Sequence, residues 1–182
     1  MFKRIAFPVA LAFGLSCTAI AIAQTGKMEF GDAMKVMTKC NVDQLRSMFT
    51  GNPMGQLDPG SAVATANTRN VDPSTVHDTD GTPLLVAAAA TDCVEGVHVL
   101  LLSGADVTDT DKQGRTALHA AAASSNANMV QLLVQYKADV NAKTAAGDTP
   151  LSLAKTNEYK GKTDQRDKIV KFLTSKGAKD KS

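Results

Sequence analysis

The sequence has few large aromatic side chains and no tryptophan. Aromatic residues make up 4% of its 182 residues, as two tyrosines and six phenylalanines. Bulky rings dominate many globular cores, so a core of that kind is not expected here. A stack of slender helices suits the composition better.

Signatures of catalysis and metal binding are also missing. The chain contains no glycine-rich phosphate loop, nucleophile elbow or zinc signature. Its three histidines, His77, His98 and His119, neither pair at i, i+4 nor cluster with cysteines, so metal-ligand spacing is absent. We therefore predict no metal, no cofactor and no small-molecule ligand.

A cluster of acids at Asp106, Asp109 and Asp111 is the one feature that could support acid/base chemistry. No large side chains accompany these acids to form a pocket. Asp109 and Asp111 are more simply explained as turn residues. The interpretation is a protein without catalytic residues.

Charge of one sign is scarce as well. The chain has 20 Lys and Arg against 18 Asp and Glu, which argues against the basic footprint of a nucleic-acid-binding protein. Basic residues do gather at the C-terminus, at Lys176, Lys179 and Lys181, but Asp180 dilutes them. We expect this tail to be a frayed, solvated end.

The N-terminus has the pattern of a secretory signal peptide. Lys3 and Arg4 precede an uncharged apolar run over residues 5–22, which ends in small residues and predicts cleavage after Ala23. Proline and glycine interrupt the run, whereas a membrane span needs about 20 continuous apolar residues. Lipid attachment at Cys17 is the weaker alternative.

Cleavage would leave residues 24–182 as a single domain of near-zero net charge in the periplasm. Secretion would expose its cysteines to an oxidising compartment. No membrane insertion is expected after cleavage of residues 1–23.

The first part of the expected domain combines a helical segment with a long loop. In residues 24–51, apolar side chains recur at intervals of three and four, which predicts two short helices that break at Cys40 and Asn41. Residues 52–76 are rich in proline and glycine and fit no regular element. This loop is either a functional insertion or a tolerated one.

Three similar copies fill the rest of the chain. Their threonines, Thr82, Thr116 and Thr149, are spaced by 34 and 33 residues. Each threonine is expected to cap a small-residue helix, with Pro83 and Pro150 at the next position, where a missing N–H costs nothing. The copies span residues 77–111, 112–144 and 145–182.

The second helices of these copies are expected to end at Gly104, Lys137 and Gly177. A left-handed residue is typical of such an end. Lys137 must therefore adopt a conformation that glycine adopts without strain.

Together these copies resemble the ankyrin repeat. The features that carry the resemblance are Thr-Pro-Leu at 82–84 and 149–151, the alanine runs at 87–90 and 120–123, and Gly-Ala-Asp at 104–106. The resemblance implies an all-α solenoid of helix-turn-helix units with short β-hairpin connections, in which residues 24–51 form a degenerate N-terminal cap.

Two further expectations follow from the resemblance. His119 stands where the family has a structural histidine that bonds to the adjoining hairpin. The third copy has extra residues around 158–166, which we expect to lengthen the turn between its helices.

The two remaining cysteines fall at comparable places. Cys40 lies between the helices of the cap and Cys93 between those of the first clear copy, so stacking would bring them to one edge. A disulfide there would be worth roughly 4 kcal/mol in the chain-entropy model. Two unpaired thiols are the alternative.

The resemblance also implies a concave surface made of hairpin tips and first helices, which binds another protein. Each candidate on it is equally consistent with an ordinary solvated turn. The candidate partner-binding residues are Asp78, Thr79, Asp80, Thr110, Lys112, Gln113, Arg115, Ser124, Asn126, Lys143, Thr144 and Asp148.

By family analogy, the leading hypothesis is a periplasmic, non-enzymatic inhibitor or self-protection partner of an exported hydrolase such as a cell-wall enzyme. The alternative is a structural or stress-related scaffold that supports a periplasmic redox or peroxide-handling system. An enzyme that uses the acid cluster ranks third.

Overall fold

The structure is a computed structural model that describes residues 30–50, 72–156 and 163–181. The expected signal peptide at residues 1–23 lies outside the described residues, as does most of the expected loop. The helices are α2 (Phe30–Thr38), α3 (Val42–Thr50), α4 (Leu84–Ala89), α5 (Val94–Leu102), α6 (Ala117–Ala123), α7 (Ala127–Gln135), α8 (Pro150–Thr156) and α9 (Thr163–Ser175), with a 3-10 turn η1 (Pro73–Thr75) before α4.

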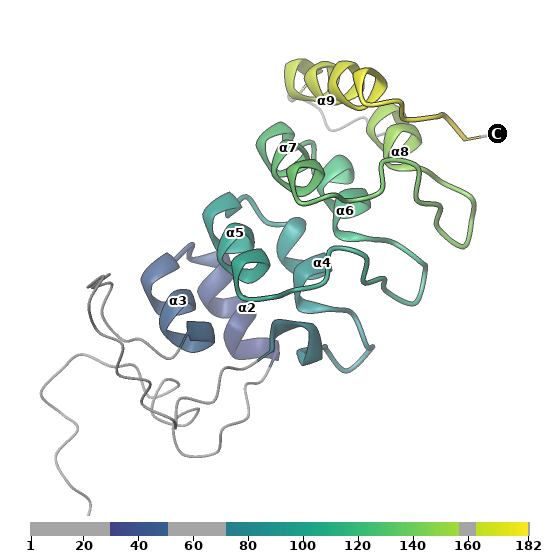
Figure 1. Ribbon diagram of the computed structural model, residues 1–182. Helices are drawn as coiled ribbons and strands as arrows, with labels where there is room; N and C mark the ends of the chain where they lie inside the picture. Colours follow the sequence, from purple (N-terminus) through teal and green to yellow (C-terminus); the bar gives the residue numbers. More distant parts are fainter. Residues whose placement is uncertain (1–29, 51–71, 157–162, 182) are drawn as a thin grey trace, which may run out of the picture.

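These helices form four antiparallel pairs stacked along one axis (Figure 1). The first helices of the pairs, α2, α4, α6 and α8, contact one another in an inner row. The second helices, α3, α5, α7 and α9, make an outer row. The all-α solenoid is therefore confirmed, and α2 with α3 forms the N-terminal pair.

The core lies between successive pairs. Leu84 and Leu118 are fully buried at equivalent positions of two inner helices, and Leu151 is 4% exposed at the third. Leu100 and Leu133 repeat the pattern in the outer row. Because each burial of about 25 cal/mol per Å² is shared by neighbouring pairs, stability accumulates along the stack.

Connections between pairs are hairpin loops that extend to one side of the stack (Figure 1). Within the described residues they contain isolated bridges rather than strands, namely His77 with Pro83 and Thr110 with Thr116. The predicted hairpins are thus present in a minimal form.

The inner helices begin in two ways. Thr149 and Ser152 bond reciprocally, with Ser152 N–H donating to Thr149 Oγ1 (3.2 Å) and Thr149 N–H to Ser152 Oγ (2.9 Å). Thr116 forms the same box with His119. The prediction is wrong for Thr82, because α4 begins one residue later, with Pro83 as its cap.

Residues 72–76, expected to be the end of the loop, are part of the stack. Asp72 Oδ1 accepts from Ser74 N–H at 2.9 Å and starts η1. The Ser74 hydroxyl bonds to Gly104 O and accepts from Asp106 N–H, at 3.3 and 3.1 Å. This segment repeats the Asp-turn that follows α5 and α7, so the expectation of irregular chain is wrong here.

The third pair differs from the others in its second helix. Of the extra residues, 157–162 lie outside the described part, whereas those from Thr163 onward belong to α9. α9 has 13 residues, against nine in α5 and nine in α7. The insertion therefore lengthens the helix as well as the connection.

The C-terminal tail is docked up to residue 181, so the expectation of a frayed end is wrong. Lys179 N–H donates to Asn141 Oδ1 at 2.7 Å, and Lys179 O accepts from Thr149 Oγ1 at 3.0 Å. Lys155 pairs with Asp180, which holds the pKa of that carboxyl below its usual value. These contacts close the last pair.

The second helices end as predicted. Gly104, Lys137 and Gly177 have φ values of 99°, 68° and 82°. Only Lys137 carries a side chain in this left-handed conformation, which costs roughly 1 kcal/mol.

The cap is attached by a disulfide between Cys40 and Cys93, whose Cα atoms are 5.3 Å apart. The predicted bridge is therefore confirmed. Gly96 makes room for it, because a Cβ there would lie 2.7 Å from Cys93 Sγ and 2.8 Å from Met37 Sδ. The bridge joins α2 and α3 to the first clear repeat.

Lys137→Gly is expected to raise the melting temperature by several degrees, since the strain of roughly 1 kcal/mol is relieved. Thermal unfolding followed by circular dichroism measures the change. Gly104→Lys, the reverse change at the equivalent position, should lower the melting temperature. An unchanged or lower value for Lys137→Gly would contradict the assignment.

Replacing both cysteines, Cys40→Ser with Cys93→Ser, should lower the free energy of unfolding by up to about 4 kcal/mol in urea titrations. Reduction of the wild type should give the same loss, because the bridge limits the unfolded chain. Two alkylatable thiols in native, unreduced protein would refute the bridge.

Candidate protein-binding site

The hairpins share one internal scaffold. Asp78, Asp111 and Thr144, spaced by 33 residues, each begin a turn. The carbonyl of each accepts from the N–H of a left-handed glycine three residues later, at 3.0, 2.9 and 2.9 Å. The side chain of each also accepts from a backbone N–H four residues on. The hairpin tips are thereby held in equivalent conformations.

Asp111 is the most buried of these scaffold residues, with 6% of its surface exposed. Its Oδ1 accepts from the N–H groups of Gln113 and Arg115, both at 2.9 Å, and its Oδ2 binds Arg115 Nε at 2.7 Å. Burial would raise the pKa of this carboxyl, but these donors outweigh it and hold the pKa below its usual value. The expectation of an ordinary turn residue underestimated Asp111.

Asp109, its neighbour in the expected acid cluster, has a raised pKa because of partial burial and the nearby Asp106 carboxylate. Asp106 itself has a lowered pKa, because the Thr108 hydroxyl and N–H donate to it. The cluster thus consists of turn carboxylates with backbone duties.

Contacts between neighbouring tips complete the row. Ala145 N–H donates to Gln113 O at 2.8 Å, and Gly114 lies so close to this strand-like contact that a Cβ would be 3.1 Å from Ala145 N. Lys112 lies 3.5 Å from Asp80 across the preceding gap, although both side chains are largely exposed. The backbone contact therefore matters more than the ion pair.

His119 connects the inner helix to the next hairpin, as the family resemblance implied. It is fully buried. Thr116 N–H lies 3.2 Å from Nδ1 and Asp148 O lies 3.1 Å from Nε2, which fits the neutral tautomer with its proton on Nε2. Burial lowers the pKa of His119.

Most of the sequence-predicted candidates do lie at the tips. Those exposed on the row of hairpins are Thr79, Asp80, Thr110, Lys112, Gln113, Arg115 and Lys143. Asp78, Thr144 and Asp148 are half-buried parts of the scaffold, and Asp148 also pairs with Lys181 at 2.7 Å.

Ser124 and Asn126 are separated from the tips. They follow the seven-residue helix α6, whose length is about 10 Å. Asn126 caps α7 by accepting from Met129 N–H at 3.0 Å, and its amide reaches Asp92 at 3.4 Å. These two residues therefore belong to the edge of inter-helix turns, which also holds the disulfide.

The inner helices add a floor of small side chains beside the tips. Ala87, Ala120 and Leu153 occupy equivalent positions and remain half-exposed while most of their helices is buried. The alanine runs signalled thin helices, and the same runs predict this smooth surface. These residues were missed as site candidates.

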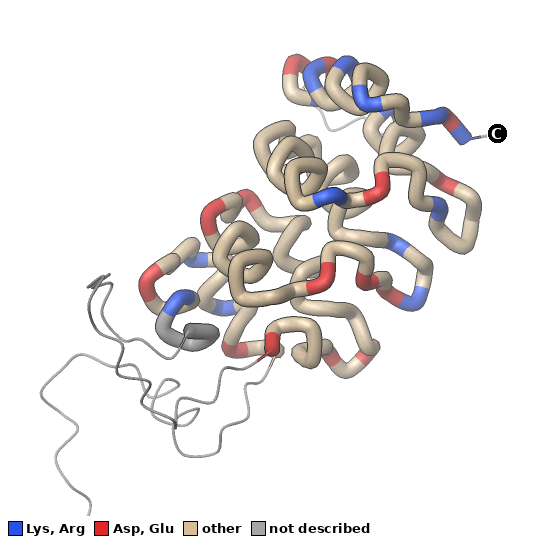
Figure 2. The backbone as a smooth tube through the Cα atoms, in the orientation of Figure 1, with Lys and Arg blue, Asp and Glu red and all other residues tan. Residues whose placement is uncertain are grey.

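Charge changes along the molecule (Figure 2). The first tip is acidic through Asp78 and Asp80, and the second is mixed. Lysines gather on α9 and at the chain end (Figure 2). A partner lying along the row would therefore meet opposite charges at its two ends.

One group of possible metal ligands occurs among the described residues. Ligand atoms of Cys40, Cys93 and Glu95 lie within 4.8 Å of one another. The thiolate is the metal-binding form of cysteine, and both sulfurs are bonded to each other here. In the described part of the chain, no helix has the length and apolarity needed to cross a bilayer.

A family profile described as "Ankyrin repeats (3 copies)" matches residues 84–182, where the structure shows three consecutive helix pairs. The chain belongs to the ankyrin-repeat family. Curated proteins include no relative that matches the chain. Ankyrin repeats indicate a protein-protein interaction module, and the family is generally a non-enzymatic binding scaffold.

His119→Leu is expected to remove a pH dependence of stability between about pH 5 and 7. Because the folded-state pKa is lowered, the unfolded chain binds the proton first. The stabilising contribution is therefore complete above the unfolded pKa and declines as pH falls. Leu85, buried at the equivalent position of the first repeat, shows that leucine fits.

Urea titrations at pH 5 and pH 7 measure this effect. His119→Leu should also cost about 1–3 kcal/mol at pH 7, because Thr116 N–H and Asp148 O lose a partner. His77→Gln, at an exposed histidine, is the control and should keep the wild-type slope. An equal slope in His119→Leu would contradict the assignment to His119.

Proposed function

We propose that this ankyrin-repeat protein is a non-enzymatic module that holds one protein partner on the surface made by its hairpin tips and inner helices. The observation that carries the proposal is the scaffold of the tips. Buried groups such as Asp111 and His119 hold the backbone, whereas Thr79, Lys112 and Gln113 point their polar chemistry outward without a core to serve.

A rigid surface of this kind favours binding energetically. Ordering a loop or side chain at an interface reduces affinity, and a preorganised surface avoids much of that cost. The small side chains of the inner floor, Ala87 and Ala120, also allow a partner's backbone to approach closely. A long, shallow interface with one protein is therefore the best-supported use of the surface.

The finer proposal is that the partner is an exported hydrolase, such as a cell-wall enzyme, which the protein inhibits or protects against in the periplasm. Two features support this location. The N-terminal sequence has the pattern of a secretory signal, and the Cys40–Cys93 bridge is a feature of oxidising compartments. The choice of a hydrolase rests on family analogy.

A scaffold for a periplasmic redox or peroxide-handling system is the second candidate, favoured by the exposure of Cys40. Glu95 counts against it, because its carboxylate lies 3.9 Å from Cys40 Sγ and repels an approaching thiolate. Resistance of the bridge to mild reductant would remove this candidate.

Affinity capture tests the leading proposal. The exported wild-type protein, used as bait in periplasmic extract, should retain one partner in stoichiometric amount and reduce its lytic activity. Lys112→Glu, at a hairpin tip, should weaken capture at least about tenfold. Lys171→Glu makes the same charge change on the exposed side of α9 and should not.

Two results would contradict this proposal. One is recovery of no stoichiometric partner together with no effect on any lytic activity. The other is equal weakening of capture by Lys112→Glu and Lys171→Glu, which would place the contact outside the row of tips.

A further inference from the structure

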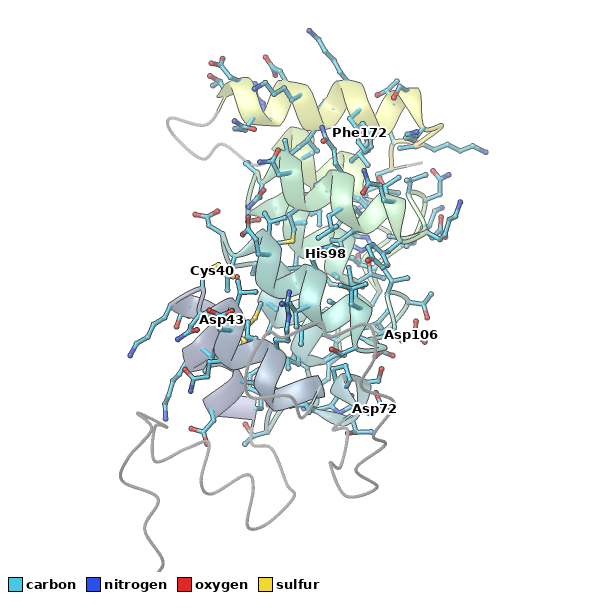
Figure 3. The ribbon with its side chains drawn as sticks, turned by 60° about the vertical axis from the view of Figure 1, so that its left-hand side comes forward. Cys40, Asp43, Asp72, His98, Asp106 and Phe172 are labelled. Carbon is cyan, nitrogen blue, oxygen red and sulfur yellow. A yellow bond between two sulfur atoms is a disulfide. The ribbon has the colours of Figure 1, made fainter. Side chains whose placement is uncertain are left out.

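A groove on the outer row, between α7 and α9, breaks the pattern of the repeats. It has a volume of about 280 Å³ and is open on one side. Its lining is defined here as the α7–α9 groove and consists of Gln131, Val134, Gln135, Lys137, Phe172 and Lys176. Figure 3 brings the outer helices forward and labels Phe172 on α9 and His98 on α5.

The equivalent place one repeat earlier is filled. There His98 of α5 and Tyr136, which follows α7, meet edge to face with ring centroids 5.8 Å apart. By the repeat spacing, His98 corresponds to Gln131 and Tyr136 to Lys176. The aromatic pair that closes one junction is thus replaced at the next by an amide and an ammonium group, which leave the groove open.

Lys137 provides a second and independent observation. It takes the left-handed conformation at φ 68° where Gly104 and Gly177 stand in the other repeats. A side chain held in such a conformation is strained, and strain of this kind is concentrated at functional sites. The same residue lines the groove, so its position fits a binding role better than a packing role.

The chemistry of the lining is amphipathic and positive. Val134 and Phe172 are half-buried apolar side chains, and Lys176 Nζ lies 5.6 Å from the Phe172 ring centroid. Among the described residues, neither Lys137 nor Lys176 has an acidic group within salt-bridge distance. Two ammonium groups beside an apolar floor complement an apolar side chain flanked by carboxylates.

We propose that the α7–α9 groove binds an acidic peptide segment of another protein, with an apolar side chain on Val134 and Phe172 and carboxylates on Lys137 and Lys176. The volume lies below the usual range for pockets that enclose a free small molecule. It suits a few side chains of an extended or helical segment that lies in the groove. This surface is distinct from the hairpin tips, so the protein contacts partners on two faces.

A labelled model peptide, Gly-Glu-Asp-Leu-Phe-Asp-Glu-Gly, tests the proposal with the full mature chain. Fluorescence anisotropy should show saturable binding, and amide NMR shifts should concentrate at residues 131–137 and 172–176. A peptide with lysines in place of the acids, and one with serines in place of Leu-Phe, should each bind at least about tenfold more weakly.

Variants of the groove separate binding from stability. Lys137→Asn keeps a residue that tolerates the left-handed conformation but removes the charge, and should weaken the peptide at least about fivefold, as should Lys176→Gln. Lys137→Arg should retain binding. Lys112→Gln, on the hairpin side, should leave binding unchanged.

Three results would overturn the proposal. They are no binding of the acidic peptide, equal binding of the basic peptide, or unchanged affinity in both Lys137→Asn and Lys176→Gln. If the acidic peptide fails and sedimentation shows a dimer that Lys137→Asn dissociates, the occupant is a second copy of the chain instead. Loss of partner capture by Lys112→Glu tests the other face and is independent of these outcomes.

Discussion

Burial of apolar side chains between neighbouring helix pairs is the constraint on which the rest of the structure depends. No pair covers its own apolar face, so Leu84, Leu118 and their equivalents are buried only because the next pair is present. The thin, alanine-rich inner helices permit this approach. The ends need special treatment for the same reason, and the disulfide at one end and the docked tail at the other provide it.

The same stacking frees the hairpins and the two outer faces for recognition. Because the core is confined to the helices, the hairpins need only backbone hydrogen bonds to keep their shape. Asp111 and His119 supply these bonds from buried positions. The exposed tips then carry no packing duty, whereas the outer groove arises where one repeat departs from its neighbours at Lys137 and Lys176.

Several parts of the fold were predictable because they repeat. Period, helix pairing, the left-handed ends and the hairpin role of His119 all depend on local patterns that recur at about 33 residues. Positions 72–76, the start of α9 and the docked tail were not predicted correctly. Each depends on contacts with residues about 30 or more positions away, such as Ser74 with Asp106 or Lys179 with Asn141.

By itself, the sequence determined the repeat, the all-α stack and the side on which the hairpins lie, since helix periodicity and turn chemistry are local properties. Only the tertiary structure decided which candidates share a surface, because Ser124 and Asn126 lie a helix length from the tips. It alone also showed that one inter-repeat junction is closed by His98 and Tyr136 and the next is open. Side chains from different repeats create that difference, and their contact is visible only after stacking.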